Sequence, residues 1–342
     1  MKNILVAASL GALTSFLTSI PASAETTQCI EIMAVPVTIS TPGVHCFKKV
    51  ISTAMASGNA ITVNANNVTI DFNDFELDGL GAGPNTEAIA VYALNRRNLT
   101  IRNARIRGFR QGIAIEETEN SNLSAGHLIE DSSFEGNTYK GIHVAGFGVT
   151  IRRNRITDTD STPPAAPAGT ISSGGSTTTA SSGASTRPSA QARTSRNAGL
   201  NKISNKTIPQ LGNGSQTAGI FADLLRNSQI IDNLILRTIS SASESRAISV
   251  KRASNVEVAR NRIQNTTART YASGIYIEAT TPGFAVVVKD NVILSGTSEL
   301  NTAIGIETSS GFTLCMNNTV TDFANSSTFG CDQEAGTFPT PS

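Results

Sequence analysis

Gly141-Ile142-His143-Val144 is one copy of a four-residue pattern that decides the fold of this 342-residue chain. The pattern is a small residue, Ile, any residue and an aliphatic residue. It also occurs as Ala60-Ile61-Thr62-Val63, Ala88-Ile89-Ala90-Val91, Gly112-Ile113-Ala114-Ile115, Gly219-Ile220-Phe221-Ala222, Ala247-Ile248-Ser249-Val250, Gly274-Ile275-Tyr276-Ile277 and Ala303-Ile304-Gly305-Ile306. The copies are 28, 24, 29, 78, 28, 27 and 29 residues apart. A period of about 28 residues is typical of a solenoid.

A second pattern, aliphatic-x-x-Asn-x-apolar, follows most copies of the first. Its asparagines are Asn73, Asn154, Asn233, Asn261, Asn291 and Asn318, while Ser132 takes this place in one copy and Asn103 lies one residue early in another. Asn tolerates left-handed backbone and bonds nearby backbone groups, so we expect it in the turn between two strands. Because the unit is too short for a crossover helix and two strands, it predicts strand, turn, strand, turn. Coils stacked about 4.8 Å apart would enclose the aliphatic side chains.

The chain resembles the right-handed parallel β-helix repeat proteins of bacteria, part of the pectate-lyase-like superfamily. The likeness rests on Val37-Thr-Ile-Ser-Thr-Pro-Gly-Val-His-Cys46, on Asn66-Asn-Val-Thr-Ile-Asp-Phe-Asn73 with Gly79, and on the later small-Ile-x-aliphatic runs. It spans roughly residues 29 to 331, apart from one insert. It implies an all-β, right-handed parallel β-helix of about nine coils with N- and C-terminal caps. The Arg-x-Pro-x-x-Arg run of pectate lyases and the Gly-His-Gly and paired-Asp motifs of polygalacturonases are missing, so the resemblance transfers a fold and no catalytic residue.

The first 24 residues have the pattern of a secretory signal. An apolar run from Ile4 to Ile20 follows Lys2 and precedes Ala22-Ser23-Ala24, which predicts cleavage after Ala24 and a secreted or periplasmic protein. No later stretch is apolar enough to span a membrane. In an exported protein the close cysteine pairs, Cys29 with Cys46 and Cys315 with Cys331, suggest two disulfides of about 3 kcal/mol each, although four cysteines allow three connectivities.

The domain limits follow from the repeat. We expect an N-terminal cap at 25–59, a β-helix domain at 60–323 and a C-terminal cap at 324–342. The N-terminal cap should hold an amphipathic helical lid, because four apolar residues have helical spacing: Phe47, Val50, Ile51 and Met55. Residues 160–196 are a low-complexity insert, to be read as a solvated loop or as a lid. Residues 200–211 are expected to form one irregular coil.

Because the interior of a β-helix is filled, binding must use columns of outward side chains. Along the first strand, one column is predicted as Thr62, Ala90, Ala114, His143, Phe221, Ser249, Tyr276 and Gly305. The next is predicted as Asn64, Tyr92, Glu116, Ala145, Asp223, Lys251, Glu278 and Glu307. Aromatic faces can stack on sugar rings, and carboxylates and lysine can bind hydroxyls or transfer protons.

Eight residues of these columns are therefore candidates for substrate binding: Tyr92, Glu116, His143, Phe221, Asp223, Lys251, Tyr276 and Glu278. The catalytic candidates are His143, Glu116, Asp223, Lys251 and Glu278, with Glu116 expected to raise the pKa of His143. The alternative is an ordinary charge ladder of Asp223, Lys251 and Glu278. His45 is expected in the N-terminal cap, and His127 is expected in a partly buried position.

Two further features carry charge. Seven arginines form a second face, either an acidic-polysaccharide patch or a set neutralised by Glu130 and Asp131: Arg102, Arg105, Arg107, Arg110, Arg152, Arg153 and Arg155. Asp71, Asp74 and Asp78 suggest a calcium site, but turn chemistry accounts for them, and we predict no metal and no cofactor. Once Lys2 is removed with the signal, 26 of the 27 Lys and Arg remain and balance 26 Asp and Glu, which argues against a nucleic-acid partner.

Two functions fit these features. The first is a polysaccharide-binding module, or a non-catalytic surface or periplasmic module in which the rigid rod itself is the function. The alternative is a polysaccharide-processing lyase, hydrolase or epimerase that acts along the first-strand columns.

Overall fold

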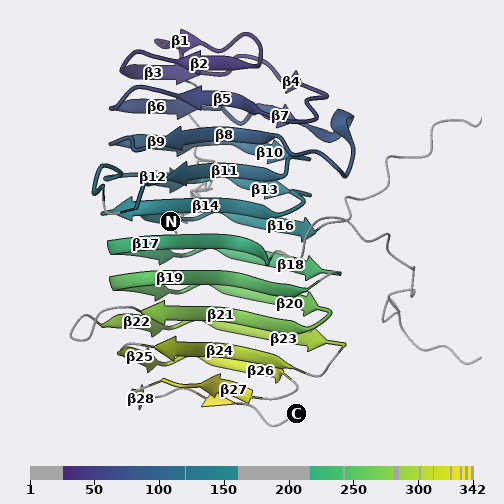
Figure 1. Ribbon diagram of the computed structural model, residues 1–342, viewed down its shortest axis with the longest axis vertical. Coiled ribbons are helices and arrows are strands. Elements are labelled where there is room, and N and C mark those ends of the chain that lie inside the picture. The colour runs from purple at the N-terminus through teal and green to yellow at the C-terminus, as the bar shows by residue number, and fades with distance from the viewer. Residues whose placement is uncertain are drawn as a thin grey trace, which may run out of the picture.

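Each coil of the chain contains three strands, which stack into three columns (Figure 1). The computed structural model describes residues 26–119, 121–160, 216–241, 243–279, 285–299, 302–310, 312–323, 326–331, 333–335 and 338–339. The predicted signal segment, the insert beyond Asp160 and the predicted irregular coil at 200–211 lie outside these residues. Among the described residues, no helix is long and apolar enough to span a membrane.

The first-strand column holds β2 (Val37–Ile39), β5 (Asn59–Val63), β8 (Ile89–Leu94), β11 (Gln111–Glu116), β14 (Lys140–Phe147), the starts of β17 (Thr217–Ile231) and β19 (Glu244–Ala259), β21 (Tyr271–Ala279), β24 (Ala303–Ser310) and β27 (Ser326–Phe329). The second-strand column holds β1 (Ile30–Glu31), β3 (Gly43–Cys46), β6 (Val68–Asp71), β9 (Leu99–Arg102), β12 (Leu128–Glu130), β15 (Thr150–Arg152), the ends of β17 and β19, β22 (Val286–Lys289), β25 (Thr313–Met316) and β28 (Gln333–Ala335).

The third-strand column holds β4 (Ile51–Ser52), β7 (Glu76–Asp78), β10 (Arg105–Arg107), β13 (Ser133–Glu135), β16 (Arg155–Asp160), β18 (Leu234–Ser240), β20 (Arg262–Ala268), β23 (Val292–Ser298), β26 (Thr319–Phe323) and β29 (Phe338–Pro339). One 3-10 turn, η1 (Leu80–Ala82), interrupts the strands. Strands of successive coils pair in parallel, for example Ile142 with Ile220 and Ile156 with Ile235. The predicted parallel β-helix is therefore confirmed, but each coil has three strands and not two, because the Asn pattern spans the second and third strands.

The repeated aliphatic residues fill the interior, as the alternation predicts. Ile113, Ile142 and Ile275 are fully buried, and one continuous apolar cluster extends from Ile32 to Val320. In the first coils Phe47 stacks on Phe72 with ring centroids 4.3 Å apart. Burial of apolar surface along the whole stack is the main source of stability for such a fold.

The recurrent asparagines form a buried ladder at the turn between the second and third strands. Asn233 N donates to Asn261 Oδ1 at 3.0 Å, and Asn261 N donates to Asn291 Oδ1 at 2.9 Å. The amide of each Asn also donates to a backbone carbonyl of the preceding coil, as Asn261 Nδ2 does to Ile230 O at 2.9 Å. The full ladder is Ala104, Ser132, Asn154, Asn233, Asn261, Asn291 and Asn318.

These asparagines were expected in the left-handed conformation, and for the ladder this expectation is wrong. The positive φ belongs to the residue before each ladder position, at Asn103, Asp131, Arg153, Asp232, Arg260, Asp290 and Asn317. Of the asparagines in the predicted pattern, Asn73, in a longer turn, has a positive φ itself (47°), as does Asn103, which lies one residue early. The turn therefore needs one residue for the left-handed bend and the next for hydrogen bonds to the buried backbone.

The coils continue into both predicted caps. β2, β3 and β4 lie within 25–59, and β27, β28 and β29 lie within 324–342. The predicted helical lid is wrong: Ile51 begins the short strand β4, Phe47 precedes a bend, and both are buried, while Val50 is 55% exposed. The apolar residues of this stretch follow the turns of the first coil and not a helical period.

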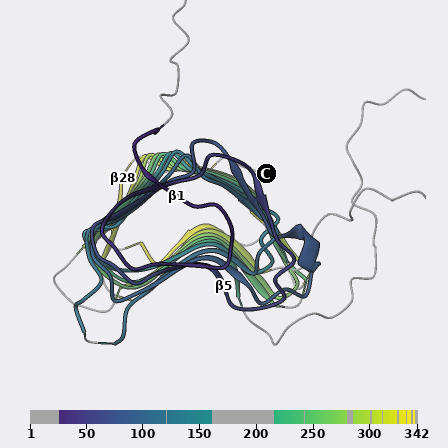
Figure 2. The same cartoon turned by 90° about the horizontal axis from the view of Figure 1, so that it is seen from above.

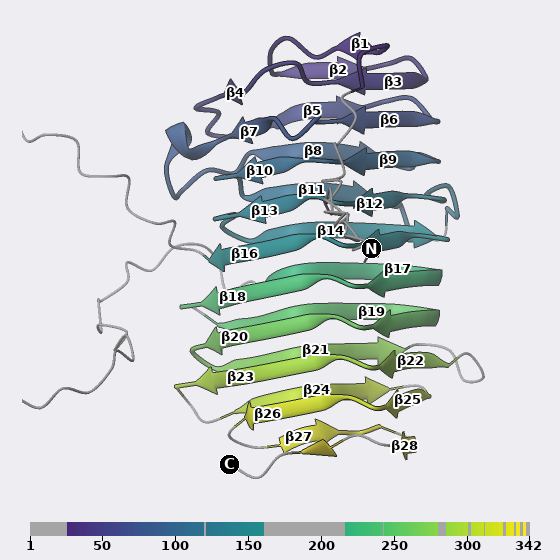
Figure 3. The ribbon, with the colours of Figure 1, turned by 180° about the vertical axis from the view of Figure 1, so that it is seen from behind.

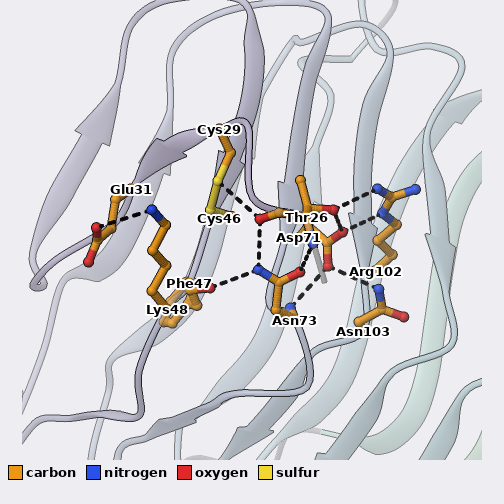
Figure 4. Close-up of a disulfide and its surroundings, with 10 residues drawn as sticks. All are labelled: Thr26, Cys29, Glu31, Cys46, Phe47, Lys48, Asp71, Asn73, Arg102 and Asn103. Atoms are coloured by element: carbon orange, nitrogen blue, oxygen red, sulfur yellow. Dashed lines mark hydrogen bonds and ion pairs between the residues drawn. A yellow bond between two sulfur atoms is a disulfide. The ribbon is translucent and has the colours of Figure 1, made fainter. Parts of the chain in front are cut away.

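Both predicted disulfides are present, Cys29–Cys46 near the start of the stack and Cys315–Cys331 near its end. Around the first, Thr26 Oγ1, Asn103 Nδ2 and Arg102 Nε all donate to the buried carboxylate of Asp71, at 2.6, 2.9 and 2.9 Å (Figure 4). Burial alone would raise the pKa of Asp71, but these hydrogen bonds, the Asn73 amide and the charge of Arg102 lower it.

The coils on either side of the insert pair with each other directly. β14 pairs with β17, and β16 pairs with β18.

Candidate functional site

The outer surface of the first-strand column, here called the first-strand face, carries most of the predicted site residues. Seen along the stack, this column bows toward the interior (Figure 2). The outward side chains are accordingly well covered: Tyr276 is 8% exposed and Ser249 is fully buried.

The hydrogen-bonding register alters both predicted columns. Val91 and not Ile89 pairs with Ile113, and Ile306 and not Ile304 pairs with Ile275. The first outward column is therefore Thr62, Tyr92, Ala114, His143, Phe221, Ser249, Tyr276 and Glu307. Ala90 and Gly305 were wrongly placed in it. A slip of two residues keeps the same face inward, so the core pattern in the sequence does not reveal it.

Lys140 lies on this face, although its place in the repeat did not predict it. Its Nζ lies 3.7 Å from the centroid of the Phe221 ring and 4.6 Å from that of Tyr139. Burial lowers the pKa of Lys140 to about 8, against the attraction of Glu116 and Asp223. A lysine with such a pKa can bind an anion or accept a proton near neutral pH.

His143 packs edge to face against Phe221 with ring centroids 5.0 Å apart. Its Nδ1 lies 3.8 Å from Glu116 Oε1 and has no hydrogen-bond partner among the described residues. Burial and the neighbouring charge of Lys140 lower the pKa of His143 to about 3. The expectation that Glu116 raises this pKa is wrong, because desolvation dominates at this position. His143 is neutral at physiological pH.

Arg246 repeats the arrangement of Lys140 two coils further along. Its guanidinium carbon lies 3.6 Å from the Tyr276 ring centroid, and Nη2 pairs with Glu244 Oε2 at 3.1 Å. The side chain is 8% exposed, and Nε and Nη1 have no partner among the described residues. Neighbouring Ser249 Oγ is also buried and unpartnered. Lys251 Nζ lies 5.8 Å from the Phe221 centroid and 5.9 Å from the Tyr276 centroid.

All four tyrosines of the chain lie at this face: Tyr92, Tyr139, Tyr271 and Tyr276. Three of them donate to carboxylates: Tyr92 to Glu116 at 3.4 Å, Tyr276 to Glu278 at 3.3 Å, and Tyr271 to Glu307. Burial and these carboxylates raise the pKa values of Tyr92 and Tyr271, so both phenols remain protonated donors at neutral pH.

Asp223 is tied to the edge of the face. Arg252 Nε donates to its Oδ1 at 2.8 Å, and Arg252 Nη1 pairs with Glu119 Oε1 at 2.7 Å. In the same loop, the buried carboxylate of Glu117 pairs with Arg226 at 3.2 Å. These ion pairs hold the loop after β11 against the following coils. Of the predicted catalytic candidates, Asp223 is the one held in a charge-assisted clamp.

The predicted arginine face separates into two groups. Arg102, Arg107, Arg110, Arg152 and Arg153 pair with carboxylates, including Arg152 with Glu130 at 2.7 Å and Arg153 with Asp131 at 2.7 Å. Arg105 and Arg155 have no carboxylate partner among the described residues. The described residues contain no cluster of three or more His, Cys, Asp or Glu that could hold a metal ion. His45 and His127 are both buried, and burial lowers the pKa of His127 to about 4.

We expect the stability contribution of Lys140 to depend on pH. The unfolded chain holds this proton up to the ordinary lysine pKa of 10.5, whereas the folded chain releases it near pH 8. Between these values the unfolded state binds more protons, so the free energy of unfolding rises with pH, by on the order of 3 kcal/mol. Urea unfolding at pH 7 and pH 10 should show that Lys140→Met lacks this rise. An equal rise in wild type and variant would contradict the assignment.

The parallel coils, with a polar and aromatic face along one column, define a β-solenoid protein. The model of the family described as "Right handed beta helix region" matches residues 88–333, and the chain belongs to this family. No curated protein matches the chain.

Several solved structures are similar to the chain, and three of them are compared with it below. The Azotobacter vinelandii Mannuronan C-5 epimerase AlgE6 A-module is 12% identical, with a TM-score of 0.40, over 90% of this chain and 88% of that one. The Dettilon tailspike protein (gp208) is 13% identical, with a TM-score of 0.40, over 91% of this chain and 60% of that one. The A. vinelandii Mannuronan C-5 epimerase AlgE4 A-module is 11% identical, with a TM-score of 0.25, over 87% of this chain and 79% of that one.

Proposed function

We propose that the protein binds a polysaccharide, laid as an extended chain along the first-strand face. One observation carries the proposal: five of the buried polar atoms without a partner among the described residues lie on this face. They are Gln111 Oε1, His143 Nδ1, Arg246 Nε, Arg246 Nη1 and Ser249 Oγ. A buried polar group left without a hydrogen bond costs about 1–3 kcal/mol, so groups of this kind mark places where a ligand or water completes the structure.

The surrounding side chains suit a sugar. Ser249 is the small residue between Phe221 and Tyr276 in the outward column, so two aromatic rings flank it along the stack. Aromatic side chains combine an apolar face with defined geometry, which suits the C–H faces of pyranose rings. Arg246, Lys251 and the tyrosine hydroxyls supply donors for sugar hydroxyls or carboxylates. The ligand would follow the stack axis because the columns do.

We further propose that the protein acts outside the cytoplasm. Two disulfides support this location, because such bonds persist in oxidising compartments. The signal-like segment at residues 1–24 points the same way. In this proposal the rigid solenoid presents its face to a glycan as a binding module.

Substitution of Arg246 tests the binding proposal. A panel of uronate and neutral oligosaccharides is screened against the full chain, and Kd is measured for the tightest ligand. Arg246→Leu should weaken binding by about tenfold to a hundredfold, since a charge-assisted hydrogen bond contributes about 1.5–3 kcal/mol. Arg269→Leu, which removes an exposed arginine from a turn, serves as the matched control and should leave Kd unchanged. Absence of binding across the panel, or equal affinity of both variants with wild type, would refute the proposal.

A second candidate is polysaccharide processing at the same face, and Lys140 favours it. Its lowered pKa and its position near His143 and Glu116 suit a group that accepts a proton from a bound sugar. Such an enzyme would release unsaturated sugars or new reducing ends, and its rate would rise as pH passes 8. Lys140→Met should then abolish turnover while binding persists. If no glycan in the panel is altered at pH 9, the chain is a binding module only.

A further inference from the structure

Three arginines stand out on the third-strand column because their guanidinium groups are unpaired. Arg105, Arg155 and Arg262 begin β10, β16 and β20, and all three are exposed. None of them has a side-chain hydrogen bond or an ion pair with any residue in the described ranges. The sequence placed Arg105 and Arg155 in a larger arginine face but did not connect Arg262 with them.

Every other arginine within the described ranges has a partner. Most pair with carboxylates, as Arg260 does with Asp232 at 2.8 Å and Arg237 with Asp158. Arg96 and Arg97 donate to backbone carbonyls. Glu76, the neighbour of Arg105 in its column, pairs with Arg107 at 3.0 Å. The unpaired arginines are thus confined to one place on the surface.

The strand register puts the three arginines in one straight line. Arg105 pairs with Ser133, Ser133 with Arg155, Arg155 with Leu234, and Leu234 with Arg262. One arginine therefore recurs at every second coil, with an uncharged residue between. Coils in a parallel sheet are about 4.8 Å apart, so adjacent arginines are spaced by about 10 Å along the stack. The third-strand column runs the length of the stack (Figure 3).

We propose that this arginine line, Arg105, Arg155 and Arg262, binds a linear acidic polysaccharide with one anionic group per disaccharide. Charges on such a polymer recur at intervals close to those of the arginines, and its chain can lie parallel to the stack. A guanidinium is always protonated, and its planar fork matches a carboxylate or sulfate. The line lies on a different column from the first-strand face, so the inference does not depend on the function proposed for that face.

Binding of a hyaluronan decasaccharide, which carries one carboxylate per disaccharide, tests the inference. We expect measurable binding of the full chain at 50 mM salt that weakens as salt rises, since exposed ion pairs are screened. Arg155→Gln should weaken it about three- to fivefold, and the triple variant Arg105→Gln, Arg155→Gln, Arg262→Gln at least about tenfold, as expected for exposed charge pairs of up to about 1 kcal/mol each. Arg269→Gln is the charge-matched control and should bind as wild type does.

Four results would overturn the inference. They are no binding of hyaluronan by wild type, wild-type affinity in the triple variant, equal weakening by Arg269→Gln, and preference for duplex DNA of the same length. Circular dichroism checks that each variant folds. Arg246→Leu should leave hyaluronan binding at the arginine line intact, so failure here and failure at the first-strand face can be told apart.

Discussion

Replacing Ile230 with lysine is expected to prevent folding. Ile230 is fully buried in the second-strand part of β17, between Ile151 and Val258 of the neighbouring coils. A charged ammonium at this point has no water and no counter-ion, and its cost exceeds about 5 kcal/mol, a large part of the stability of an ordinary domain. We expect insoluble protein, or a circular dichroism spectrum without the strand signal.

The adjacent residue supplies the matched control. Gln229 is exposed, and its amide donates to Glu257 Oε2 at 3.1 Å. Gln229→Lys places the same charge one residue away, on the outer side beside a carboxylate, and should change the free energy of unfolding by less than about 1 kcal/mol. A folded Ile230→Lys protein with wild-type stability would contradict the assignment of inward and outward positions.

Removal of one rung of the asparagine ladder should produce the second largest loss. The Asn261 side chain accepts from Asn233 N and Asn233 Nδ2 and donates to Ile230 O and Asn291 Oδ1. Asn261→Ala leaves several of these buried groups unpaired at about 1–3 kcal/mol each, so the free energy of unfolding should fall by about 3–5 kcal/mol. Urea denaturation followed by circular dichroism measures it.

Asn64→Ala is the control for this substitution. Asn64 is exposed, and its hydrogen bonds to other described residues are made by its backbone, which alanine keeps. The free energy of unfolding of the Asn64→Ala variant should stay within about 0.5 kcal/mol of that of the wild type. If Asn261→Ala has an equally small effect, the ladder does not contribute to stability as described.

The sequence predicted the solenoid because its core pattern is local. Ile142 and the equivalent isoleucines recur with a period that only stacking coils satisfy, and six of the eight are fully buried as expected. Ile89 and Ile304 are only partly buried, because the strand register shifts by two residues in their coils. The third strand was missed because the Asn pattern contains only one apolar residue after the turn. A single apolar residue cannot show the inward and outward alternation by which a strand is recognised. The helical lid was predicted wrongly because the spacing of Phe47 and Ile51 matches a helical period by chance. Their burial is instead set by the turns of the first coil.

The first-strand face was predicted only in part. His143, Phe221, Ser249 and Tyr276 fall in one column as expected, because these coils share one register. Lys140 and Arg246 were missed, because strict alternation places a residue two before the repeated Ile inside the solenoid. Instead the intervening Gly141 faces inward toward Ile156, and Lys140 is turned outward. A repeat-by-repeat comparison of that position, which holds Gln111, Lys140 and Arg246, is the signal that would have pointed to it.

The most direct test of the binding account is a crystal structure of the full chain with the tightest oligosaccharide from the panel. The account predicts sugar rings above Ser249, in contact with Phe221 and Tyr276, with the glycan running parallel to the stack and Arg246 bonded to it. A glycan bound only on another column or across an end of the stack, with the first-strand face left empty, would contradict it.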